Sequence, residues 1–145
     1  MIQRIQSIFL LLSGLGFAGQ FVTDLATSTS PIPNLMADNV YEVQDSPILL
    51  GITILGIVVS IAAIFLFRNR PLQQKLSIFS LILGIFLPLV AFLLIYNERT
   101  VKPDWAAIHD QAGLYLMAIP VICGFLAYRY IGKDDKLVKS MDRLR

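Results

Sequence analysis

Four stretches of the chain carry no charged residue, and each is long and strongly apolar. They cover residues 5–23, 46–67, 76–97 and 111–128 and are 19, 22, 22 and 18 residues long. An α-helix rises about 1.5 Å per residue and needs about 20 apolar residues to cross the hydrocarbon core of a bilayer. The pattern predicts one integral membrane domain over residues 1–145, with spans at about 5–24, 47–67, 75–97 and 110–131.

The connections between these stretches are short, which favours antiparallel neighbours. Residues 26–46 contain Pro31 and Pro33 and show little periodicity, so we expect an outer loop there. Residues 68–75 form a basic inner turn, in which Pro71 is well placed to begin the third helix. The predicted fold is an all-α membrane protein, a four-helix transmembrane bundle with up-down-up-down topology.

Residues 132–145 form a basic tail with a helical pattern of apolar positions. Leu137, Val138, Met141 and Leu144 recur at helical spacing, with cationic residues between them. We expect a short amphipathic cytoplasmic helix that lies on the inner leaflet, docks onto a protein partner, or does both. The residues expected to contact lipid or partner are Lys136, Leu137, Lys139, Met141, Arg143, Leu144 and Arg145.

Composition supports a membrane protein and excludes several soluble classes. The chain is 56% hydrophobic, its mean hydropathy is +0.69, and 15% of its residues are charged, against about 25% in soluble domains. With a single cysteine it cannot form a disulfide scaffold. The high hydrophobic fraction and the small charged fraction also exclude a soluble enzyme and a nucleic-acid-binding domain.

The charged residues divide unequally between the two sides of the predicted spans. One side holds ten of the twelve basic residues with three acids, and the other holds two basic residues with seven acids. Because cytoplasmic loops collect Lys and Arg, the basic side is expected in the cytoplasm. This predicts a multi-pass membrane protein with both termini cytoplasmic.

The first stretch also resembles a cleavable signal peptide, since Arg4 precedes a leucine-rich run. The run is longer than the usual apolar region of such peptides, and no lipobox cysteine follows it. We therefore expect an uncleaved first span.

A glycine pattern in the first span matches a nucleotide-binding fingerprint in letters alone. Gly14, Gly16 and Gly19 have the spacing of the dinucleotide motif, and Asp38 follows about 20 residues later. That motif requires a strand before it and a parallel sheet around it, which this chain cannot build. We interpret the small residues as helix-packing positions, in the pairs Gly14 with Ala18 and Gly56 with Ser60.

Pro88 and Pro120 lie near the middle of the third and fourth predicted spans, where each should kink its helix. Paired broken helices occur at transport sites, although proline is common in membrane helices in general. No Asp, Glu, Lys, Arg or His lies within the four charge-free stretches, which argues against ion-coupled transport. The polar residues noted for the interior are Ser13, Thr53, Ser60 and Ser80.

One outer constellation could support chemistry. His109, the only histidine, stands beside Asp110 and near Asp104 and Glu98. One histidine with scattered carboxylates is more typical of a solvated helix start, with Asp110 serving the N-terminus of the fourth span. We assign no catalytic, cofactor-binding or metal-binding residue.

The two ends of the chain carry a family resemblance. The opening Met1-Ile-Gln-Arg-Ile-Gln-Ser-Ile-Phe-Leu-Leu-Leu12 and the closing Asp135-Lys-Leu-Val-Lys-Ser-Met-Asp-Arg-Leu-Arg145 resemble small four-span inner-membrane proteins of Bacteroidota, catalogued as a domain of unknown function. The resemblance implies a bacterial inner-membrane location and an architecture of four membrane-spanning helices. It identifies no catalytic or binding residue.

The expected function is a non-enzymatic accessory or scaffolding subunit of an inner-membrane complex, with no cofactor. Its expected partners are membrane lipids and another inner-membrane or cytoplasmic protein, and not nucleic acid. The alternative is a small oligomeric transporter or channel for an uncharged or lipidic solute. A membrane enzyme based on His109 ranks third.

Overall fold

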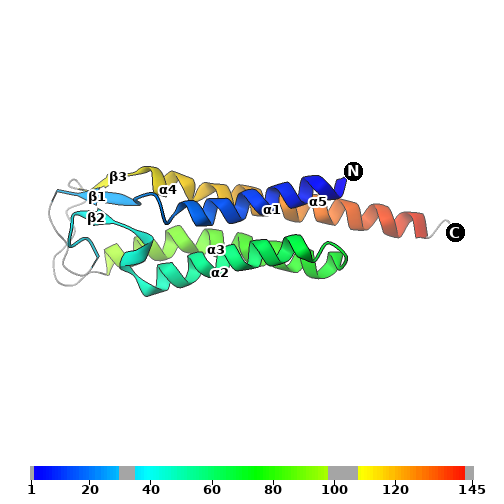
Figure 1. Ribbon diagram of the computed structural model, residues 1–145, viewed down its shortest axis with the longest axis horizontal. Coiled ribbons are helices and arrows are strands. Elements are labelled where there is room, and N and C mark those ends of the chain that lie inside the picture. Colours follow the sequence, from blue (N-terminus) through cyan, green and yellow to red (C-terminus); the bar gives the residue numbers. More distant parts are fainter. Residues whose placement is uncertain (1, 30–34, 98–107, 143–145) are drawn as a thin grey trace.

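The computed structural model describes residues 2–29, 35–97 and 108–142, and it is mostly helical (Figure 1). The long helices are α1 (Ile2–Gly19), α2 (Pro47–Phe65), α3 (Arg70–Tyr96) and α5 (Ala118–Asp142), and the short α4 (Ala112–Leu116) precedes α5. Helix α1 contacts α2 and α5, and α3 contacts the same two helices. The long helices therefore form a bundle in which each is packed between two neighbours.

Three helical stretches are long and apolar enough to cross a membrane. They are Pro47–Phe65, Arg70–Tyr96 and Ala112–Val138, whereas the apolar part of α1, Ile5–Gly19, is shorter. Helix α2 begins with Pro47 in its first turn, where a missing backbone donor has no cost. Helix α3 begins five residues before the predicted span, because the Asn69 side chain accepts a hydrogen bond from Leu72 N (3.3 Å) and caps it.

The prediction of an all-α fold was wrong at the outer end of the bundle. Strands β1 (Ala26–Ser28), β2 (Val40–Tyr41) and β3 (Ile108–Asp110) form an antiparallel sheet in the order β2-β1-β3, and a 3₁₀ turn, η1 (Val43–Asp45), follows β2. Ala26 pairs with Tyr41 on one side and with Asp110 on the other. The sheet thus joins the predicted outer loop, residues 26–46, to the connection that follows the third predicted span.

The C-terminal region also differs from the prediction of a separate tail helix. Helix α5 continues without a break from the bundle to Asp142, and its last part extends past the ends of the other helices (Figure 1). The region from Gly132 to Asp142 contains no proline, so nothing stops the helix once it is established.

Two hydrophobic clusters fill the bundle. The larger cluster, which includes Phe17, Leu49 and Leu87, also receives Leu25 and Tyr41 from the sheet end. A smaller cluster at the other end contains Leu10, Ala63, Ala127 and Ile131. Because Ser13 and Ser60 each fall between members of the two clusters along α1 and α2, a polar layer separates them.

Candidate functional site

The polar layer is a row of three serines from three helices. Ser80 Oγ of α3 lies 3.2 Å from Ser13 Oγ of α1 and 2.9 Å from Ser60 Oγ of α2, and none of the three side chains is exposed. Thr53, one layer further out, donates instead to Leu49 O of its own helix (2.9 Å). The four polar residues expected in the interior are all buried, and their hydroxyl groups form hydrogen bonds within the protein.

Further buried polar side chains were missed by the sequence analysis. Gln6 and Gln20 lie seven residues on either side of Ser13, and Gln73 lies seven residues before Ser80; all three glutamines are buried. Gln6 donates to Tyr130 O and Gln20 to Gly113 O, both at 3.2 Å. A period of seven places residues on the same helix face, so this spacing was a signal that could have identified them.

The small residues allow close helix approach at the predicted positions and at others. A Cβ at Gly14 would lie 3.5 Å from Ser60 Cβ, and a Cβ at Gly56 would lie 2.7 Å from the Phe17 ring. Ala18 is half-buried in α1. Close approaches also occur at Gly16, where a Cβ would lie 2.7 Å from Cδ of Pro120, and at Gly113, where a Cβ would meet the backbone carbonyl oxygen of Asp24.

The two prolines affect their helices differently. Pro88 lies inside α3, which continues through it as one helix to Tyr96. Pro120 lies within the apolar stretch Ala112–Val138, where it is the third residue of α5, just after the break between α4 and α5 at Met117. A proline there has no intrahelical donor to lose within α5, and its ring blocks continuation from the preceding turn.

A cavity of about 300 Å³ opens between the sheet and the outer part of the bundle, and we call it the outer pocket. Its lining is largely apolar, and Asp110 of β3 is its one ionised side chain. The Tyr41 hydroxyl, also in the lining, is already used, since it donates to Ala91 O (3.2 Å). The principal apolar wall residues are Pro88, Ala91, Phe92 and Ile95 of α3 and Leu114 of α4.

The sheet end of the molecule is acidic. Among the described residues of this end, 20–46 and 108–112, five are acidic and none is Lys or Arg. Burial together with the charges of Asp45, Asp24 and Asp38 raises the pKa of Glu42. Burial also raises the pKa of Asp45, whose carboxylate accepts a hydrogen bond from Glu42 N (2.6 Å). The acidic residues without a described Lys or Arg among them give the described part of the sheet end an excess of negative charge.

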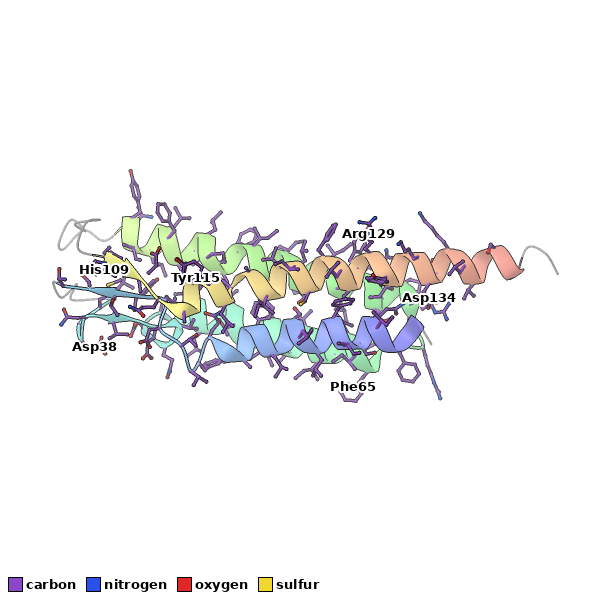
Figure 2. The ribbon with its side chains drawn as sticks, turned by 90° about the horizontal axis from the view of Figure 1, so that it is seen from above. Asp38, Phe65, His109, Tyr115, Arg129 and Asp134 are labelled. Atoms are coloured by element: carbon purple, nitrogen blue, oxygen red, sulfur yellow. The ribbon has the colours of Figure 1, made fainter. Side chains whose placement is uncertain are left out.

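The His109 constellation does not form a metal or acid–base cluster within the described residues. His109 is exposed on β3 and pairs with Thr27 of β1, and Figure 2 shows it at the same end as Asp38. The expectation that Asp110 serves a helix start was wrong, since Asp110 belongs to β3 and Gln111 occupies the N-cap of α4. Glu98 and Asp104 lie outside the described residues.

The opposite end carries the basic residues and the extension of α5. Arg70 Nε lies 3.4 Å from Asp134 Oδ2, and Figure 2 shows Arg129 and Asp134 along this part of α5. Phe9 stacks on Tyr130 with ring centroids 5.5 Å apart, and Lys133 Nζ lies 5.7 Å from the centroid of the same ring. These contacts fix the base of the extension to α1 and α3.

Beyond this base, the described side chains of α5 are largely exposed. Lys136 is exposed, and Leu137 exposes 53% of its surface although it is apolar. Lys139 and Met141 belong to α5, but their side chains are not described. Arg143, Leu144 and Arg145 lie outside the described residues, so the predicted docking stripe can be followed only in part.

Comparison with known proteins places nearly the whole chain in one family. Residues 2–144 match the family model DUF4293, described as a domain of unknown function. No curated protein and no solved structure matches the chain. The match therefore supplies no site residue, and the outer pocket and the α5 extension rest on the geometry alone.

Proposed function

We infer that this chain, which belongs to the DUF4293 family of domains of unknown function, is a non-enzymatic accessory or scaffolding subunit of a bacterial inner-membrane complex. The observation that carries the proposal is the extension of α5 beyond the bundle (Figure 1). From residue 132 to 142 this extension is about 16 Å long at 1.5 Å per residue. It offers a partner a helix face that the bundle itself does not cover.

The proposal places all four long helices across the membrane. The surface of the bundle favours this, because large apolar side chains such as Val58, Phe86 and Ile122 are each more than half exposed along its length. Helix α1 has the shortest apolar part, and the non-helical chain after it follows at membrane depth. Non-helical backbone is tolerated there when protein buries it, and both Gln20 and Leu25 are almost fully buried.

The charge distribution supports an orientation with both termini in the cytoplasm. The end that carries the N-terminus and the α5 extension is basic, while the sheet end is acidic. Exposed aromatic residues mark both ends, with Phe65 and Phe67 at the basic end and Tyr96 and Tyr115 at the acidic end. Such rings prefer the headgroup layer, and Lys and Arg collect on the cytoplasmic side.

The bundle interior favours a scaffold over a pathway. Ser13 and Ser60 each form a hydrogen bond with Ser80, and all three side chains are fully buried. The transporter alternative receives its support from the outer pocket, which lies beside Pro88. A flux assay in liposomes discriminates the two, because a scaffold gives no flux.

The test is affinity purification in mild detergent at native abundance, with the tag inserted after Thr29 so that both chain ends stay free. Leu137, Met141 and Leu144 are changed together to Ser, which removes the apolar stripe of the extension. We expect a stoichiometric partner to co-purify with the unaltered chain and to be lost from this variant, while membrane insertion is unchanged.

The matched control changes Asp142 to Ser, since helical spacing places this residue on the opposite face of the extension from the apolar stripe. The control should keep the partner. Retention of the partner by the stripe variant would contradict docking through α5. Purification of the unaltered chain alone, as a monomer or homo-oligomer, would contradict the subunit proposal altogether and direct attention to flux.

A further inference from the structure

The outer pocket has the properties of a binding site for a hydrocarbon chain. Its volume of about 300 Å³ equals roughly ten water-sized volumes of about 30 Å³, which suits a chain of about ten carbons. Pro88, Ala91 and Ile95 line it from the outer turns of α3, and Leu114 lines it from α4. Apolar pockets with few polar groups are the usual form of small-ligand sites.

The polar groups of the outer pocket select for a cation. Asp110 presents a carboxylate, which accepts hydrogen bonds and cannot donate them. The Tyr41 hydroxyl already donates its proton to Ala91 O. His109 neighbours Asp110 on a strand, where successive side chains point to opposite faces, so it does not share the Asp110 side.

The surroundings strengthen this selection. The described part of the sheet end, residues 20–46 and 108–112, holds four further acids and no Lys or Arg. An anionic headgroup would therefore meet repulsion, whereas a protonated amine would meet an attractive field. A short apolar chamber with one carboxylate matches a molecule with an aliphatic body and an amine.

We propose that the outer pocket binds the aliphatic chain of an amphiphile whose protonated amine pairs with the Asp110 carboxylate. This chemistry is shared by an aminophospholipid and by a free alkylamine. The inference goes beyond the proposed function and does not depend on it, because the pocket and the α5 extension lie at opposite ends of the molecule.

The test uses the full chain in a neutral maltoside detergent and a decylamine that carries a photoreactive diazirine on its chain. Photolabelled peptides should come from the segments that line the pocket, which are the outer part of α3, α4 and the three strands with Leu25. Decylamine should compete with labelling at about fivefold lower concentration than decanol, as expected for one partly exposed charge pair. Changing Asp110→Asn should abolish that difference while decanol competes as before.

Two pairs of variants control the interpretation. Leu114→Trp fills the outer pocket and should abolish labelling, whereas Ile122→Trp alters an exposed side chain of α5 outside the pocket and should not. Asp38→Asn removes an exposed charge that does not line the pocket, so it should reduce the preference for the amine much less than Asp110→Asn does. Should Leu114→Trp fail to fold, Phe92→Ala opens a wall from an exposed position and should weaken competition by both compounds.

Two further arms identify the source of the ligand. Competition by phosphatidylethanolamine, but not by phosphatidylglycerol, assigns the site to an aminophospholipid; competition by decylamine alone assigns it to a free alkylamine. Equal competition by decylamine and decanol, labelling confined to segments that do not line the pocket, or undiminished labelling of a folded Leu114→Trp protein would each overturn the proposal.

Discussion

The serine row that joins three helices predicts a graded loss of stability. Changing Ser80→Ala removes both contacts, to Ser13 Oγ and to Ser60 Oγ, while changing either partner to Ala removes one. Hydrogen bonds between membrane helices contribute about 0.6 kcal/mol on average. We expect Ser80→Ala to lower the free energy of unfolding by about 1.2 kcal/mol, roughly sevenfold in the unfolding equilibrium, and each single partner change by about half as much.

The assay is reversible unfolding in mixed lipid–detergent micelles, followed by far-ultraviolet circular dichroism. A double-mutant cycle between Ser13→Ala and Ser80→Ala should give a coupling of about 0.6 kcal/mol. The cycle between Ser13→Ala and Ser60→Ala should give a coupling near zero, because each of these hydroxyls contacts Ser80. Ser140→Ala, at an exposed position of α5, serves as the surface control.

Two results would refute this reasoning. If Ser80→Ala is as stable as the unaltered chain, the row does not stabilise the bundle. If the Ser13–Ser60 coupling equals the couplings with Ser80, the serines act through general packing and not through the two contacts. The second outcome would point to helix separation at this layer as the quantity that matters.

Two further predictions concern the outer end. Gly113→Ala places a Cβ against the backbone carbonyl of Asp24 and should lower the free energy of unfolding by about 1–3 kcal/mol. The control Gly51→Ala, with open space around it, should be neutral or slightly stabilising when both variants are compared by thermal melting. Folding raises the pKa of Glu42 and of Asp45, so the folded state binds protons more readily than the unfolded chain does. The resulting stability is complete below about pH 4 and is lost as pH rises through the folded pKa values. The melting temperature should therefore be higher at pH 4 than at pH 7, and Glu42→Gln should reduce this difference.

The helices were predictable because each is encoded by a continuous local property. A run without charge identifies a membrane-length helix whatever lies around it, and α2 and α3 follow such runs closely. Membership of a family catalogued as a domain of unknown function was also confirmed, since the family match covers residues 2–144.

The sheet and the outer pocket could not be predicted in this way. Strands of two or three residues are too short to show alternation, and β1 pairs with β3 across a separation of about 80 residues. The break at Met117 was missed for a related reason, because it lies inside a continuous apolar run and does not interrupt the hydrophobic pattern. Asp110 and Pro88 share a pocket only because the sheet closes over α3.

The strand order of the sheet has a consequence for biogenesis. The central strand β1 leaves the ribosome early, yet its partner β3 is synthesised only after α2 and α3. During that interval one hydrogen-bonding edge of β1 has no partner strand from its own chain, and unpaired edges attract other chains and proteases. Completion of the sheet therefore requires that α2 and α3 have already been synthesised, so protease protection of residues 26–28 would report this stage of assembly in a nascent chain.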